Sequence, residues 1–133
     1  DDAGWTRSPA AHQNGSRKCF YNDGIRVVAG EANSPFSRAV MVAEATSLVT
    51  NLGSAGVGYI NGDLTVALAR SPVDERIGIQ ADSHRAADGI AVGTATLFDR
   101  VGPFGSAMTT AVANAAAQID FSATDFRSII NYE

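Results

Sequence analysis

The chain has 133 residues, of which 45% are apolar and 18% are charged, and its net charge is −4. This length suits one domain with a hydrophobic core, and the composition argues against a disordered chain. The weak negative charge and the scattered arginines argue against nucleic-acid binding, and no apolar run is long enough to cross a membrane. A single cysteine, Cys19, excludes an internal disulfide framework and is typical of a reducing compartment, so we expect a cytoplasmic protein.

The N-terminal part of the chain predicts an arm followed by an extended segment. Residues 1–18 are polar and show no periodicity, so we expect a flexible arm or linker there. Residues 19–29 are rich in β-branched and aromatic side chains, which favour a strand, and Asp23-Gly24 should interrupt it with a turn. The chain begins at Asp1 without a methionine, which favours a processed or truncated product with further residues upstream.

One helix is predicted next. Ser34 is a suitable N-cap, and Pro35 fits the first helical turn because no backbone N–H is needed there. The body runs from about Phe36 to Leu52, and Gly53 is a candidate for the residue that ends it. The helix is apolar on almost every side, and such a helix must be covered on most of its surface. We therefore expect a buried central helix.

After the helix the apolar period changes from 3.6 to 2, which predicts strands. We expect these strands at about residues 57–60, 63–70, 76–85, 90–99 and 104–113. Asp88-Gly89 is typical of a tight hairpin, and Gly102-Pro103 should break the chain in the turn that starts at Asp99. One strand, one buried helix and an antiparallel meander predict an α+β architecture.

The predicted strands and helix form one domain over residues 19–114. The tail over residues 115–133 contains Ser122-Ala123-Thr124-Asp125, which favours the start of a short helix. We expect this helix to pack on the sheet or on a partner.

Two acidic residues are candidates for catalysis. Glu44 is the only acid in the predicted helix, and it shares a face with Val40 and Leu48. A carboxylate buried there must be hydrogen-bonded, paired or held with a raised pKa, so Glu44 is catalytic, or it points through a gap to water, or it pairs with an arginine from another strand. Asp63 follows Asn61-Gly62 at the mouth of an apolar strand, where it is either a functional carboxylate or a turn residue.

Histidine, cysteine and glycine patterns narrow the possible chemistry further. His84 lies on a predicted strand, where it is either partly exposed and structural or a general base paired with a carboxylate. The sequence holds no Gly-x-Ser-x-Gly elbow, no Cys/His cluster with metal-ligand spacing and no phosphate-binding glycine loop. We therefore expect neither a serine hydrolase triad, nor a metal, nor a nucleotide cofactor.

The stretch from Asn61 to Val66 has an Asn-x-Asp-Leu-Thr-Val pattern that resembles a corner of hot-dog-fold acyl-CoA thioesterases. Ala29-Gly30-Glu31, Thr96-Leu97-Phe98-Asp99 and Gly102-Pro103-Phe104-Gly105 fit the same resemblance in the same order. Together they are similar to the C-terminal hot dog of a double-hot-dog acyl-CoA thioesterase, over about residues 25–113. The resemblance implies the hot-dog fold, in which an antiparallel sheet wraps around one central apolar helix.

The resemblance also implies roles for single residues. Asp63 takes the position of the aspartate that orients the hydrolytic water, and Glu44 that of an acid on the helix. The serine or threonine of the family falls near Ser83 or His84, and its glutamine falls near Thr109. A threonine hydroxyl has a shorter reach than a glutamine amide, which favours either another acid–base arrangement around Glu44 or a loss of catalysis.

Three further residues are candidates for contact with the substrate: Asn61, His84 and Arg70. The phosphates of CoA need cationic contacts, and Arg70, Arg76 and Arg85 are suitable because a guanidinium binds phosphate well.

The leading hypothesis from the resemblance is a lipid-metabolism enzyme that hydrolyses an acyl-CoA-type or acyl-carrier thioester with carboxylate-activated water. It needs no cofactor, because CoA is part of the substrate. The alternative is a non-catalytic acyl-CoA-binding or scaffold hot dog. An enoyl-CoA hydratase-like enzyme fits less well, because Asn33-Ser34-Pro35 at the helix start lacks the Asp/His pair of that branch. A lone hot dog exposes a sheet edge, so we expect a second hot-dog domain, through homodimerisation or from a separate chain.

Overall fold

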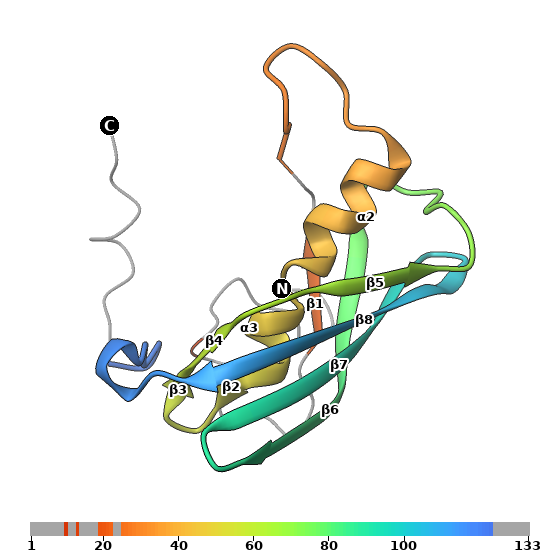
Figure 1. The fold of residues 1–133 in the computed structure, drawn as a ribbon. Helices are drawn as coiled ribbons and strands as arrows, with labels where there is room; N and C mark the ends of the chain where they lie inside the picture. The colour runs from red at the N-terminus through yellow and green to blue at the C-terminus, as the bar shows by residue number, and fades with distance from the viewer. Residues whose placement is uncertain (1–9, 11–12, 14–18, 23–24, 124–133) are drawn as a thin grey trace.

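The structure is a computed structural model that describes residues 10, 13, 19–22 and 25–123. In this part of the chain a curved antiparallel sheet lies against one helical segment (Figure 1). In chain order the elements are β1 (Cys19–Asn22), α2 (Pro35–Ala43), α3 (Thr46–Asn51), β2 (Leu52–Gly53), β3 (Gly56–Val57), β4 (Tyr59–Asn61), β5 (Thr65–Leu68), β6 (Ile77–Ala87), β7 (Ile90–Asp99), β8 (Gly102–Ala113) and the 3-10 helix η1 (Ala115–Ala117).

The helical segment starts as the sequence predicts. Ser34 caps α2 by accepting a hydrogen bond from the backbone N–H of Ser37, and Pro35 is the first helical residue. A turn at Glu44 and Ala45 then separates α2 from α3, so the single predicted helix is two short ones in line. The predicted end, at about Leu52 before Gly53, is confirmed to within one residue. The helix already stops at Asn51, because the next residue is extended and joins β2.

The helical segment is buried along most of its length, as the sequence predicts. Within residues 35–51, Pro35, Phe36 and Glu44 are the exposed residues, and the others are buried or half-buried. Ala39, Val42 and Val49 are fully buried against the sheet, whereas Phe36 in the first turn is 64% exposed. The exposed part is therefore the first turn of α2 and the turn at Glu44.

The sheet has the strand order β1-β6-β7-β8-β4, and β5 also pairs with β8. All of these pairings are antiparallel, which confirms the predicted meander. Between β6 and β7, Asp88 and Gly89 have φ values of 50° and 79°. Two consecutive positive φ values define the type I′ turn that this dipeptide predicts.

Two predicted boundaries differ from the structure. The first strand ends at Asn22 instead of continuing to residue 29, and residues 25–33 form a loop. The Asn33 side chain holds this loop, since it donates to the Ile25 carbonyl at 2.6 Å and accepts from Val27 N–H at 3.0 Å. Gly102-Pro103 does not form the predicted turn after β7 either. The turn is made by residues 100–101, and Gly102 already starts β8.

The core lies between the helices and the inner face of the sheet. Its largest buried side chains are Ile77, Ile79, Leu97 and Phe104. Along β7 the odd-numbered residues from Ala91 to Asp99 are buried, and the even-numbered ones face outward. This period of two fixes which residues face the helices. The α+β prediction is confirmed, and a curved sheet with one helical segment against it is the hot-dog arrangement.

The predicted arm over residues 1–18 and the tail helix from Ser122 fall largely outside the described residues. The division into arm, domain and tail therefore stays a prediction.

Candidate functional site

Three of the predicted site residues lie on one line across the sheet. His84 on β6 is paired with Gly93 on β7, and Gly93 is paired with Thr109 on β8. Paired residues project to the same face of a sheet. That face is the inner one, because a Cβ at Gly93 would lie 2.3 Å from the hydroxyl of Thr50 on α3. Beyond β8 the line reaches Asp63, whose carbonyl accepts from the Thr109 hydroxyl at 2.8 Å.

Asp63 sits at the corner between β4 and β5, on the sheet edge, and it is exposed. Its Oδ1 accepts a hydrogen bond from the backbone N–H of Thr110 at 2.7 Å. This N–H, helped by the Thr110 side chain, holds the pKa of the Asp63 carboxyl below its ordinary value. Asp63 is therefore an ionised, oriented carboxylate at neutral pH.

Thr109 holds the corner at Asp63 in place. Its side chain is buried, at 1% exposure, and its hydroxyl is shared between the Asp63 carbonyl at 2.8 Å and the Thr110 carbonyl at 3.3 Å. A hydroxyl has one hydrogen to donate. Thr109 therefore uses that hydrogen to hold the chain at Asp63.

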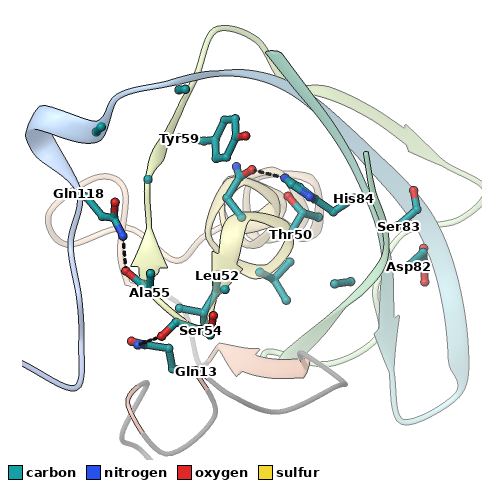
Figure 2. Close-up of a pocket in the computed structure, with 18 residues that line it drawn as sticks. Gln13, Thr50, Leu52, Ser54, Ala55, Tyr59, Asp82, Ser83, His84 and Gln118 are labelled. Carbon is teal, nitrogen blue, oxygen red and sulfur yellow. Dashed lines mark hydrogen bonds between the residues drawn. The ribbon is translucent and has the colours of Figure 1, made fainter. Parts of the chain in front are cut away.

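A cleft of about 760 Å³ opens at the other end of the line, where α3 ends (Figure 2). It lies between that helix end, the β2–β3 hairpin, β4 and β6. The residues that line it are Gln13, Val49, Thr50, Asn51, Leu52, Gly53, Ser54, Ala55, Gly56, Gly58, Tyr59, Ala81, Asp82, Ser83, His84, Ala113, Ala115 and Gln118. A volume of this size is in the usual range of small-molecule sites.

His84 is the predicted site residue whose ring lies in this cleft. Its Nε2 is 3.0 Å from Oδ1 of Asn51, the last residue of α3. The Tyr59 ring from β4 stands edge-on to the imidazole, with the ring centroids 5.7 Å apart and an angle of 75° between the planes. Figure 2 shows the His84 and Tyr59 rings near each other at the end of the helix.

Ser83 precedes His84 and lines the cleft, yet its hydroxyl points to the outer face of the sheet. Ser83 Oγ lies 2.7 Å from Thr94 Oγ1, and Asp82 Oδ2 accepts from Thr96 at 2.8 Å. An irregularity in the β6–β7 pairing between Ala81 and Ser83 places Asp82 and Ser83 on the same side. In Figure 2 both side chains point away from the cleft. The structure therefore does not bring the Ser83 hydroxyl together with Asp63 or Thr109.

Arg70 lies outside the cleft and binds within the protein. Its two terminal nitrogens each contact one oxygen of Asp99 at 2.8 Å, and Nη2 also donates to the Gly102 carbonyl at 2.9 Å. Asp99 is buried, and its carboxylate also accepts from the N–H groups of Val73 and Val101. The guanidinium and these N–H groups hold the pKa of Asp99 well below its usual range. Arg70 thus clamps the end of β5 to the β7–β8 turn.

Glu44 and Asn61 are not among the residues that line the cleft. Glu44 is the C-cap of α2 and is exposed, which agrees with the alternative in which it points to water. The helix leaves its outer side uncovered there, and the argument for catalysis that rested on burial no longer holds. Asn61 is half-buried on β4, opposite Ala111.

With this geometry in view, the chain was compared with known proteins. The family described as the acyl-CoA thioesterase C-terminal domain matches residues 2–113, which is more than half of the chain. The chain belongs to this family. Its thioesterase-like hot-dog fold follows from that membership and from the architecture described above. No curated protein matched the chain.

Two residues of the cleft, Asn51 and Tyr59, are not among the site residues that the sequence of this thioesterase-family domain predicts. Tyr59 belongs only to the strand predicted at residues 57–60. The available signal was the polar run at the end of the helix, where Thr46, Thr50 and Asn51 are all buried. Buried polar side chains need partners, and those of Asn51 come from β6, which is distant in sequence.

The described residues of this thioesterase-family domain contain neither a metal-binding cluster nor a membrane-spanning helix. No cluster of His, Cys, Asp or Glu in the described part of the chain has an arrangement that suits a metal ion. Across the same residues, no helix has both the length and the apolar character required to span a bilayer.

Proposed function

We propose that the chain hydrolyses an acyl-CoA-type thioester, with a water molecule oriented by Asp63. Family membership supports the substrate class. The observation that carries the proposal is the Asp63 carboxylate itself, which the Thr110 N–H orients and keeps ionised at a corner held by the Thr109 hydroxyl. Asp63 is also the residue that the family resemblance assigns to the hydrolytic water.

The chemistry is an acyl transfer to water. The water oxygen attacks the thioester carbonyl carbon, the carbonyl oxygen becomes an oxyanion, and the C–S bond then breaks to give a carboxylic acid and the thiol of CoA. Asp63 accepts a hydrogen bond from the water and turns its lone pair toward the carbon. Backbone N–H groups or hydroxyls along the strands stabilise the oxyanion.

The test is a panel of acyl-CoAs of increasing chain length, assayed by release of free CoA. We expect turnover by the wild-type chain and a kcat lower by about 100-fold or more in Asp63→Asn. The amide oxygen of that variant still accepts the Thr110 N–H, so the fold should be retained. Asp88→Asn is the matched control. It makes the same change at an exposed turn position with φ of 50°, which asparagine tolerates, and it should keep the wild-type rate.

A second candidate is an acyl-CoA-binding hot dog without hydrolysis. Thr109 favours it, because the hydroxyl in the place of the family glutamine is buried and already bonded to backbone carbonyls. Calorimetric titration with a non-hydrolysable acyl-CoA thioether separates the two candidates. Binding without turnover of any acyl-CoA would replace hydrolysis by this second function.

We also propose that a second hot-dog domain covers the outer face of the sheet. Ile60, Ile90, Val92, Met108 and Val112 are exposed there, at 38% to 58% of their surface. We call these five residues the outer apolar patch. Exposed apolar patches of this kind are typical of protein interfaces.

A further inference from the structure

The side chain of Asn51 fixes which nitrogen of His84 carries a proton. Asn51 is buried, and its amide nitrogen points to the Ser47 hydroxyl at 3.4 Å. The amide oxygen is thereby directed to His84 Nε2, at 3.0 Å. An amide oxygen accepts hydrogen bonds but cannot donate them. Nε2 must therefore carry the hydrogen, and in the neutral ring the lone pair lies on Nδ1.

The other ring nitrogen is available for chemistry in the cleft. The hydrogen bonds among the described residues engage His84 through Nε2 and leave Nδ1 without a donor. The residue is exposed and lines the cleft. The edge-on Tyr59 ring holds the imidazole from β4 while Asn51 holds it from α3, so two elements fix its orientation (Figure 2).

The groups around the His84 ring are mostly uncharged. Tyr59 on β4 is the titratable neighbour, whereas Asn51 on α3 and Gly93 on β7 carry no charge. On β6 itself, the Asp82 carboxylate is bound to Thr96 on the outer face. Arg85 is paired with Val92, which also faces outward. The ring thus faces mainly uncharged groups.

Asp63 is less suited to hold a proton. Its carboxyl has a lowered pKa, and a weaker base takes up a proton less readily in the transition state. Asp63 also lies outside the residues that line the cleft, whereas His84 is among them. His84 and Asp63 stand at opposite ends of the line, with Gly93 and Thr109 between them, so one water molecule does not contact both. A thioester held in the cleft is therefore attacked by a water at His84.

We infer that His84 is the general base of the cleft and that Asn51 is the residue that positions it. This inference rests on the proposed thioester hydrolysis and places the attacking water at His84 in the cleft, in place of Asp63. Nδ1 takes a proton from water as the water oxygen bonds to the thioester carbonyl carbon. When the C–S bond breaks, the imidazolium returns that proton to the thiolate sulfur, which leaves as the CoA thiol. The new carboxylic acid releases its remaining proton to solvent, so the ring ends neutral.

The first test measures the tautomer directly and needs no activity. The full chain, labelled with ¹⁵N-histidine, gives two imidazole spin systems, because His12 and His84 are the only histidines. A His12→Gln variant assigns the signals of His84. We expect the neutral ring to carry its hydrogen on Nε2 in the wild type and to populate the Nδ1–H form in Asn51→Ala. A wild-type ring protonated mainly on Nδ1 would overturn the positioning role.

The second test follows hydrolysis against pH, with free CoA measured by chromatography because dye detection of thiols depends on pH. His84→Gln should lower kcat by about 100-fold and remove the acid limb of the profile. Asn51→Ala should lower kcat by about 10- to 100-fold, with a smaller effect on KM, since its main effect is to misorient the base. Asn51→Asp should move the acid limb to higher pH, because a carboxylate stabilises the imidazolium.

The possible outcomes separate this inference from the function on which it rests. His12→Gln is the activity control and should keep the wild-type rate. Wild-type turnover that His84→Gln leaves intact would overturn the base role and leave hydrolysis standing. Loss of turnover in His84→Gln with an unshifted profile in Asn51→Asp would overturn the role of Asn51 alone. A wild-type chain that turns over no thioester would overturn the proposed function, and the base role with it.

Discussion

The ion pair between Arg70 and Asp99 predicts a specific dependence of stability on pH. The pKa of Asp99 lies below its value in the unfolded chain, which is near 4 for a carboxyl. The stabilisation from this carboxylate is therefore fully present above about pH 4 and is lost as the pH falls from there toward the folded-state value. In Arg70→Gln the pKa of Asp99 should move back toward its ordinary value, so this acid loss should become smaller.

Urea unfolding of the wild type and Arg70→Gln at pH 7 and pH 3 measures the effect. We expect Arg70→Gln to be clearly less stable at pH 7, because it leaves a buried carboxylate without its cation, and the gap to the wild type should narrow at pH 3. Arg100→Gln is the control, since Arg100 is 72% exposed and surface pairs contribute little. A gap that stays constant between the two pH values would contradict the assignment.

The sequence predicted the candidate site only where a local pattern reported the environment. The Asn-Gly-Asp pattern placed Asp63 at the mouth of a strand, and in the structure Asp63 lies in the corner before β5. Contacts between segments that are distant in sequence could not be predicted from a local pattern. Nothing near Arg70 indicates that its guanidinium binds Asp99, 29 positions away, and nothing near Asn51 indicates His84. A single pattern cannot specify partners that the fold brings together.

At the level of elements, Gly93 allows α3 to approach β7 closely. A Cβ at this position would lie 2.3 Å from Thr50 Oγ1 and 2.5 Å from Thr50 Cβ. Gly93→Ala should therefore push α3 outward and destabilise the fold by about 1 to 3 kcal/mol. Adding Thr50→Ala relieves the contacts with Oγ1 and Cγ2 but not that with Cβ, so the cost of Gly93→Ala should shrink without disappearing.

Chemical denaturation of the single and double variants measures this coupling. Gly62→Ala is the matched control, because no atom lies within 4 Å of its Cβ position and its φ is not positive. It should leave stability unchanged or slightly higher, since alanine restricts the unfolded chain. Equal effects of Gly93→Ala and Gly62→Ala would refute the close approach. The Gly93 variant should also disturb the Asn51–His84 contact, which depends on the same helix.

The elements that the sequence predicted best are those whose period is set by a single buried face. The strand over residues 90–99 alternates strictly and the one over residues 104–113 alternates from Ala107 to Val112, and the structure places both within one or two residues of the prediction. The helix was harder, because alanine and valine do not say which side is covered. Its interruption at Glu44 and Ala45 carries no glycine or proline, so no local breaker marks it.

At the scale of the whole molecule, the outer face of the sheet presents apolar side chains on neighbouring strands. Val112 on β8 is paired with Ile60 on β4 and with Ile90 on β7, and Met108 and Val92 continue the outer apolar patch along β8 and β7. All five side chains lie opposite the helices, and in the described residues no element covers them. A second hot-dog domain with the same patch offers a complementary cover.

We therefore expect the chain to form a dimer through the outer apolar patch at micromolar concentration. Val112→Lys places a charge at the centre of the patch and should shift the dimer to monomer without loss of secondary structure, because this side chain is already 52% exposed within one chain. Val101→Lys makes the same change at a side chain that is 65% exposed in the β7–β8 turn, at the opposite end of these strands, and should leave the dimer intact. Light scattering after size exclusion measures both. A wild type that stays monomeric would leave the patch to a hot dog from a separate chain, whereas a dimer that Val112→Lys does not weaken would place the interface on another surface.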